Sequence, residues 1–170
     1  VPASPFESAG AEILAADVKA LLDGHGAIGV AEVMNFPGVI DGDPDIVAKI
    51  AAAGHRRVDG HAPGLCGRPL DAYLSAGVES DHECTELDEA EEKRRKGMWV
   101  FIRQGSSTKN IAALIPMVLR HGTRHVALCT DDRAYQAFRR QVRDPAWQKA
   151  ALVQALAARL ALARQMREKS

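Results

Sequence analysis

The sequence carries no excess of charge of either sign and no long apolar run. Its 22 lysines and arginines balance its 22 aspartates and glutamates, so no basic surface indicates a nucleic acid or an anionic membrane as a partner. No apolar run reaches the roughly 18 residues that a membrane span needs, and no signal peptide is recognisable. We therefore expect neither a nucleic acid nor a membrane as a partner.

Cysteine is also scarce, and two common patterns of cysteine and histidine are missing. Cys66, Cys84 and Cys129 form no Cys-x-x-Cys pair, which favours a reducing cytoplasm over a disulfide framework. The His-x-Glu pattern of one class of zinc-dependent deaminases is absent as well. The chain opens on Val1 rather than on methionine, which leads us to expect the interior of a longer protein.

What the sequence does contain is a regular alternation of short β-prone runs and amphipathic runs. The predicted strands are residues 27–33, 56–59, 78–80, 98–102 and 124–128, and the predicted helices are residues 11–22, 43–53, 69–76, 86–96 and 109–121. Residues 35–38 read as a turn-rich loop. Short loops without a hairpin signal indicate parallel strands with right-handed crossovers. The prediction is an α/β fold, a partial TIM-type (β/α) barrel of about five parallel strands with crossover helices.

The composition changes after Arg133. Residues 134–170 are rich in alanine, arginine, glutamine and leucine, are broken at Asp144-Pro145, and predict one short and one long helix. Two interpretations stay open: a helical extension of the domain, or a terminus unrelated to it. We expect residues 1–133 to be the partial barrel, and residues 134–170 to be a helical tail that packs weakly or not at all.

Four of the predicted strands lead into side chains that can bind a metal: Glu32, His61, His82 and Asp131. The carboxyl ends of parallel barrel strands meet at one mouth, so these side chains should gather within about 4–7 Å of one another. Divalent metals take imidazole and carboxylate ligands from several elements at once. The four positions together predict a catalytic metal site.

Each of these residues, taken alone, has a plainer interpretation. Glu32 could be a capping or ion-paired glutamate, because a buried carboxylate is costly unless it is paired or bound to a cation. His61, between Gly60 and Gly64, could be an ordinary loop histidine. The charged run from Glu86 to Lys96 is interpreted as a helix face in contact with solvent. The shared position at four strand ends is what favours a metal site.

Several runs, in this order, resemble the adenine deaminase family of the amidohydrolase superfamily. They are Val1–Glu7 (VPASPFE), Gly29–Val39 (GVAEVMNFPGV), Asp59–Leu65 (DGHAPGL), Ser80–Glu83 (SDHE), Ile102–Ser106 (IRQGS) and Thr130–Arg133 (TDDR). The resemblance implies that residues 1–133 are a partial metal-dependent hydrolase barrel and that the reaction is the hydrolytic deamination of adenine to hypoxanthine and ammonia. It also implies a dinuclear site for a divalent metal, with manganese or iron ahead of zinc.

The resemblance assigns roles to the metal-capable residues. Glu32 is implied to be a bridging carboxylate, and His61 and His82 are implied to be ligands from the next two strands. Asp131 is implied to bind metal and to move protons, with Glu83 as a further acid or base beside His82. The small-molecule partner implied by this chemistry is a purine.

Two further residues are implied to contact that purine, Arg103 and Ser106. The chain also departs from the family at three points. Gln104 stands where the family has glutamate, the family's His-x-His motif is absent, and the family's continuation after Arg133 is replaced by the alanine-rich tail. The chain therefore resembles the middle of such an enzyme, and its own activity is not expected.

Two other functions stay open at this point. One is a different amidohydrolase that acts on a cyclic amide, and the other is a non-catalytic remnant of a barrel. A cytoplasmic location and a possible homo-oligomer complete the expectations from the sequence.

Overall fold

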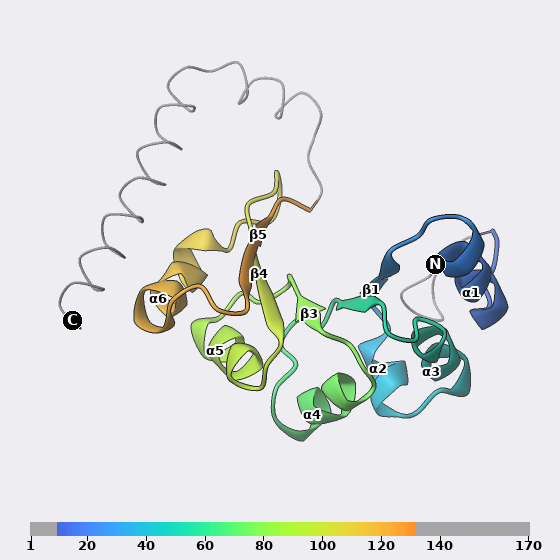
Figure 1. The fold of residues 1–170 in the computed structure, drawn as a ribbon. Helices are drawn as coiled ribbons and strands as arrows, with labels where there is room; N and C mark the ends of the chain where they lie inside the picture. Colours follow the sequence, from blue (N-terminus) through green and yellow to red (C-terminus); the bar gives the residue numbers. More distant parts are fainter. Residues whose placement is uncertain (1–9, 132–170) are drawn as a thin grey trace, which may run out of the picture.

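Strands and helices alternate along residues 10–131, which are the residues that the computed structural model describes (Figure 1). The elements in chain order are α1 (Ala15–Gly24), β1 (Gly29–Val33), α2 (Phe36–Ile40), α3 (Pro44–Ala51), β2 (Arg57–Gly60), α4 (Gly67–Ser75), β3 (Ser80–Asp81), α5 (Leu87–Arg95), β4 (Trp99–Arg103), α6 (Ile111–His121) and β5 (Val126–Cys129). The predicted α/β class is confirmed. The predicted helical tail lies outside the described residues.

The strands follow one another in sequence order and pair in parallel, but they form two sheets. One sheet has the order β1-β2, and the other has the order β3-β4-β5. The two sheets are neighbours, because the backbone N–H of Glu79 donates to the carbonyl of Val58 at 2.9 Å and the N–H of Trp99 donates to the carbonyl of Glu79 at 2.8 Å. Residues 10–131 therefore give parallel strands in sequential order, and they do not form a closed barrel.

Helix α3 begins at an aspartate side chain that caps it. The Asp43 Oδ1 atom accepts the backbone N–H groups of Asp45 at 2.9 Å and Ile46 at 3.3 Å, and Pro44 starts α3. An aspartate cap followed by proline satisfies N–H groups that have no partner within the helix and presets the backbone angle of the first turn. The start of α3 was predictable from these two residues.

The short helix α2 corrects the prediction of a loop at residues 35–38. Asn35 caps it, because its Oδ1 atom accepts the N–H of Gly38 at 3.0 Å, and Pro37 lies in its first turn. Asparagine, proline and glycine are frequent in turns, so the composition alone favoured a loop. The same residues also suit a helix start, and the burial of Val39 in the core stabilises the helix.

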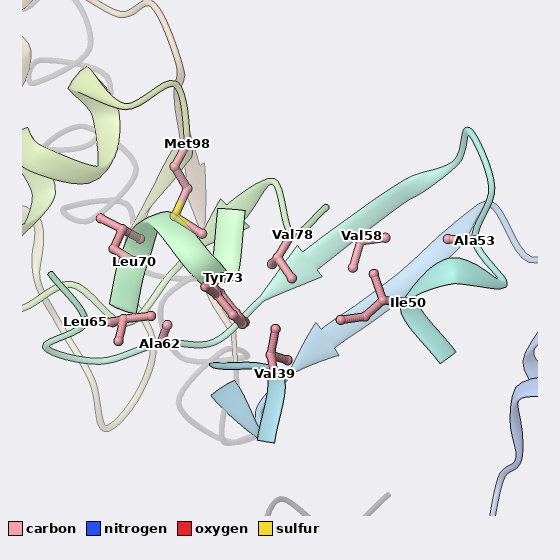
Figure 2. Packing of buried hydrophobic residues seen from close by; sticks show 10 residues of the cluster. All are labelled: Val39, Ile50, Ala53, Val58, Ala62, Leu65, Leu70, Tyr73, Val78 and Met98. Carbon is pink, nitrogen blue, oxygen red and sulfur yellow. The ribbon is translucent and has the colours of Figure 1, made fainter. Parts of the chain in front are cut away.

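The core consists of two clusters on the helix side of the strands. Figure 2 shows the larger one, which consists of Val39, Ile50, Ala53, Val58, Ala62, Leu65, Leu70, Tyr73, Val78 and Met98. The smaller cluster lies around β4, α5 and α6 and consists of Cys84, Ala90, Val100, Ile102, Leu114 and Met117. Burying one large apolar side chain stabilises a fold by about 1.5–3 kcal/mol, so these two clusters supply much of the free energy that holds the helices against the strands.

The strands have two different faces. Val58, Val100 and Ile102 belong to the two core clusters and so pack against helix residues. The helices α2 to α6 lie along one side of the row of strands in Figure 1. A groove on the other face is lined by residues from all five strands, together with Ile28 and Glu79, which lie just before β1 and β3. None of the helices within residues 10–131 is long and apolar enough to cross a membrane.

Candidate metal centre

Five residues at or near the ends of the strands come to the same edge of the two sheets. Glu32 lies near the end of β1, His61 directly follows β2, and His82 directly follows β3. Arg103 is the last residue of β4, and Asp131 lies two residues beyond the end of β5. Because the strands are parallel, their carboxyl ends share one edge, which is where ligand sites of α/β proteins are built.

An irregularity in β1 directs the Glu32 side chain. The pairing with β2 shifts between Val30 and Val33, so β1 contains one residue more than its partner over this stretch. Glu32 has a φ of +50°, in the left-handed region that residues with a Cβ rarely adopt. A bulge of this kind re-aims a side chain at the edge of a sheet. Glu32 can therefore reach the strand ends although it lies inside a strand.

Glu32, His61 and His82 form a close group. The Glu32 Oε1 atom lies 3.0 Å from Nδ1 of His61 and 3.2 Å from Nε2 of His82. The two imidazole rings meet edge to face, with centroids 5.4 Å apart and an interplanar angle of 74°. One ligand atom from each of the three residues lies within 4.8 Å of the others, which is close enough for all three to bind one cation.

A second group overlaps the first through His82. It consists of His82, Glu83 and Asp131, whose ligand atoms also lie within 4.8 Å of one another. The Glu83 Oε1 atom is 3.3 Å from Nε2 of His82 and 3.5 Å from Nδ1 of His61. Three carboxylates and two imidazoles therefore share this strand-end cluster, a donor set that suits manganese, iron or zinc.

Arg103 holds the two carboxylates of the second group. Its Nη2 atom donates to Glu83 Oε2 at 2.7 Å, and its Nη1 atom bonds both Glu83 and Asp131. Burial lowers the pKa of Arg103, but the bonded carboxylates of Glu83 and Asp131 raise it by more than burial lowers it. The pKa therefore lies above its ordinary value, and the guanidinium stays charged. Its buried Nε atom has no hydrogen-bond partner within residues 10–131. The two terminal nitrogens of the Arg103 guanidinium are thus held by Glu83 and Asp131.

Ser106, the other residue expected to contact a purine, lies in the loop between β4 and α6. The loop is closed by a bridge between Gln104 and Lys109, and by a bond from the Gly105 N–H to the Thr108 carbonyl at 2.9 Å. Ser106 is half-buried there. The structure thus places Arg103 at the cluster itself and Ser106 three residues beyond it, and their contacts with a purine stay a prediction.

Tyr73 fixes the backbone behind the cluster. Its buried hydroxyl donates to the carbonyl of Val33 at 2.6 Å and accepts the backbone N–H of His61 at 3.1 Å. Burial raises the pKa of Tyr73 well above its usual range, so the hydroxyl stays protonated. The sequence analysis missed Tyr73, and its position on a short amphipathic helix would have indicated burial but not this pairing.

Gly60 allows β2 and β3 to approach closely below the cluster. A Cβ atom at Gly60 would lie 2.4 Å from the carbonyl oxygen of Ser80 and 2.6 Å from a methyl carbon of Val78. The Ser80 hydroxyl donates to Asp59 at 2.8 Å, and the Gly60 N–H donates to the Ser80 hydroxyl at 3.3 Å. Only glycine fits at position 60, so this glycine sets the separation of the strands that carry His61 and His82.

Helix α5 corrects the interpretation of Glu86–Lys96 as a helix face in contact with solvent. Within it, Glu89 is 6% exposed and Lys93 is fully buried. The Lys93 ammonium bonds Asp81 at 3.0 Å and Glu89 at 2.6 Å. A signal was present in the sequence, because Lys93 stands three residues after the apolar Ala90 and so shares its face of the helix.

The fold and the cluster define an α/β protein with imidazoles and carboxylates gathered at the carboxyl ends of parallel strands. No family model matches the chain. It is 50% identical over 134 residues to an adenine deaminase of Dehalococcoides mccartyi, covering 79% of this chain and 24% of that protein. It is 53% identical over 133 residues to one of Methylobacterium nodulans and 48% identical over 133 residues to one of Brucella anthropi.

Over about four-fifths of its length the chain is thus similar, at about half identity, to proteins named adenine deaminase. It spans about a quarter of the length of the curated relatives that it matches. The resemblance expected from the sequence motifs is confirmed by these similarities.

Proposed function

We propose that this chain supplies part of the metal-dependent active site of a hydrolase that converts adenine to hypoxanthine and ammonia. The observation that carries the proposal is the group formed by Glu32, His61 and His82, whose donor atoms lie within 4.8 Å of one another. This group occurs in a chain that is about half identical to proteins named adenine deaminase. We propose the deamination of adenine for a protein of the relatives' full length, of which this chain would be a part.

The donor set supports a divalent cation at each of the two overlapping groups. Glu32, His61 and His82 would hold one cation, and His82, Glu83 and Asp131 lie at the adjoining position. Mixed imidazole and carboxylate donors suit manganese, iron and zinc. When bound, such a cation supplies a water molecule whose pKa is lowered to near neutrality.

The reaction needs a base and an acid beside the purine C6 atom. The water oxygen forms a bond to C6, and the bond between C6 and the amino nitrogen breaks as ammonia leaves. Asp131 would accept the proton of the attacking water and return it to the ring nitrogen or the leaving amine. Glu83 lies within 3.5 Å of both histidines and is the second candidate for proton transfer.

Arg103 would act in this reaction through the carboxylates that it bonds. Because its guanidinium bonds Glu83 and Asp131 at once, it orients both proton-transfer groups toward the same region. Ser106, three residues further on, stays the candidate for a direct contact with the purine. This division of roles agrees with the burial of Arg103, which is 3% exposed.

We propose further that the two sheets are consecutive parts of one barrel wall. The hydrogen bonds that join Val58 to Glu79 and Glu79 to Trp99 support continuity between β2 and β3. The groove opposite the helices supports it too, because residues of all five strands, β1 to β5, line it. A crystal structure of a protein of the relatives' length would test this, and a flat or split sheet there would contradict it.

The experiment for the proposed function uses the protein of the relatives' length that carries these residues. Adenine turnover is followed by ammonia release with added manganese or iron, and cyclic amides are assayed in parallel. We expect turnover of adenine and its loss in His61→Ala and His82→Ala. Turnover of a cyclic amide alone would favour the other amidohydrolase activity.

A matched control separates a lost ligand from general damage. His55 is an exposed histidine in the turn before β2, at the opposite end of the strand from His61. His55→Ala should leave turnover and bound metal unchanged. If His61→Ala and His55→Ala behave alike, or if His61→Ala retains full turnover, His61 has no part in the mechanism.

A further inference from the structure

The peptide groups next to His61 are held by a buried ion pair. The backbone N–H of Ala62 donates to Asp81 Oδ1 at 2.8 Å, and the carbonyl of Ala62 accepts from Lys93 Nζ at 2.6 Å. Lys93 and Asp81 also bond each other at 3.0 Å, and both are fully buried. The pair therefore fixes the N–H and the carbonyl of the residue that follows His61.

The same pair joins the two strand ends that carry the histidines. Asp81 is the last residue of β3 and directly precedes His82, whereas Ala62 directly follows His61. Glu89 extends the attachment, because its Oε1 atom accepts from Lys93 at 2.6 Å and from the N–H of Gly64 at 2.8 Å. The loop after β2 and the end of β3 are thus fastened to one ammonium group on α5.

Stability alone does not explain this arrangement. Removing two charges from water costs several kcal/mol per ion, and well-packed apolar residues in place of a buried ion pair are often equally or more stabilising. An apolar pair, however, could not bond both backbone groups of Ala62. The charges are therefore accounted for by the geometry that they impose on the neighbouring backbone.

The cluster is not a second cation site. Asp81, Cys84 and Glu89 bring three possible ligand atoms within 4.8 Å. The Lys93 ammonium already lies 3.0 Å from Asp81 and 2.6 Å from Glu89, which is where a cation would have to bind. The Cys84 thiol donates to Asp81 at 3.1 Å, and burial raises the pKa of that thiol, so it stays protonated.

We infer that Lys93 is a positioning residue, which acts through Asp81 and Ala62 to set the relative placement of the His61 and His82 rings. The inference rests on the proposed function for its meaning, since it concerns two of the proposed ligands. It predicts that loss of the Lys93 ammonium disturbs both rings although Lys93 touches neither. Mutation of residues that support metal ligands in this way commonly lowers the affinity for the metal by roughly 10–100-fold.

The test uses the 170-residue chain itself. Lys93→Met keeps much of the length of the side chain and removes its three donors. The histidine ring signals of the metal-free protein are recorded by NMR with ¹⁵N-labelled histidine, and Co²⁺ is then titrated by its visible absorption. Both measurements are made well below the unfolding temperature, where a change in stability leaves the population of folded protein unchanged.

The matched control is Lys96→Met, at the residue that directly follows the same helix. Lys96 also bonds carboxylates, Asp71 at 2.6 Å and Glu92 at 2.9 Å, and the carbonyl of Gly67 at 2.9 Å, but it lies at the surface. We expect Lys93→Met to shift the ring signals of His61 and His82 and to weaken Co²⁺ binding roughly 10-fold or more. Lys96→Met should change neither measurement.

Unchanged ring signals in Lys93→Met, or equal changes in both variants, would overturn the inference. If the unaltered chain does not bind Co²⁺, the metal part of the proposed function fails for this chain, and the ring signals of the metal-free protein still decide the positioning role. If Lys93→Met does not fold, Lys93→Arg takes its place. Arginine keeps the charge but presents a planar fork, so displaced ring signals support the inference and unchanged ones overturn it.

Discussion

The hydroxyl of Tyr73 lies 3.1 Å from the backbone nitrogen of His61 and accepts its hydrogen. The same oxygen donates to the carbonyl of Val33 at 2.6 Å, so one side chain of α4 joins the ends of β1 and β2. Glu32 directly precedes Val33, and His61 is itself bonded, so both proposed ligands lie next to the bonds that Tyr73 makes. The structure therefore links the geometry of the proposed ligands to a tyrosine that bonds the backbone of His61 and of Val33, the residue after Glu32.

Replacing Tyr73 with phenylalanine tests that junction. Tyr73→Phe leaves the half-buried carbonyl of Val33 and the half-buried N–H of His61 without this partner, which should lower the free energy of unfolding by about 1–3 kcal/mol. Urea unfolding measures the change. Ser75→Ala removes an exposed hydroxyl from the same helix and should have almost no effect. A Tyr73→Phe protein as stable as the parent would show that the two bonds contribute nothing.

Gly60 offers a test of the close approach of β2 to β3. In Gly60→Ala the new methyl group would meet the Ser80 carbonyl and the Val78 side chain at 2.4 and 2.6 Å. Overpacking of this kind costs about 1–3 kcal/mol or more, and here the nearest atom is backbone, which has little room to move. Gly24→Ala, where nothing lies within 4 Å, is the control and should be neutral. Thermal unfolding of both variants decides the matter.

Arginine geometry at position 103 should matter more than its charge. Arg103→Lys keeps the positive charge but loses the two-pronged bond to Glu83, so we expect a loss of about 1–3 kcal/mol in denaturant unfolding. The surface pair of Arg57 and Glu79 provides the comparison, since the Arg57 side chain is 73% exposed. Arg57→Lys should cost less than about 1 kcal/mol. Equal losses in the two variants would mean that burial of Arg103 confers no advantage.

The buried ion pair of Asp81 on β3 and Lys93 on α5 makes stability depend on pH in a defined direction. Burial raises the pKa of Asp81, but Lys93 and the bonds from Ala62 and Cys84 lower it more, so its pKa lies below the ordinary value of 3.8. The stabilisation from this carboxylate is fully present above that value and is lost as the pH falls through the folded-state pKa. Asp81→Asn lacks this contribution at every pH.

Unfolding free energies of the two proteins should therefore converge on acidification. Measured from about pH 6 down to about pH 2, the advantage of the parent chain over Asp81→Asn should shrink as the pH falls below the ordinary aspartate value. At the alkaline end, burial lowers the pKa of Lys93 but Asp81 and Glu89 raise it more, so the ammonium persists above its ordinary value of 10.5. An advantage that stays constant on acidification would contradict the assignment of the charges.

Much of this architecture was predictable because strand ends can be recognised locally. His61 and His82 directly follow short runs bounded by turns, and the regular alternation of strand and helix indicated that these ends would share an edge. The helix starting at Pro44 was equally evident from its aspartate cap. The α/β class with parallel strands therefore followed from neighbouring residues alone.

Other features depend on contacts between distant residues, and the sequence did not reveal them. The spacing from Ala90 indicates which helix face carries Lys93, but no local pattern indicates that Asp81, twelve residues earlier, offers it a carboxylate. The bond between Arg103 and Glu83 spans twenty residues in the same way. The division of the strands into two sheets also depends on pairing beyond the reach of periodicity. The roles of the strand-end residues in metal binding stay a prediction.

The left-handed backbone conformation at Glu32 is unfavourable for the stability of the fold, although the proposed site needs the carboxylate at this position. A residue with a side chain in this conformation costs of order 1–3 kcal/mol, and glycine or asparagine would relieve most of that strain. Neither replacement offers a carboxylate to His61 and His82. Directed evolution for thermostability alone should therefore favour the loss of glutamate at position 32, whereas selection that also demands turnover should retain it.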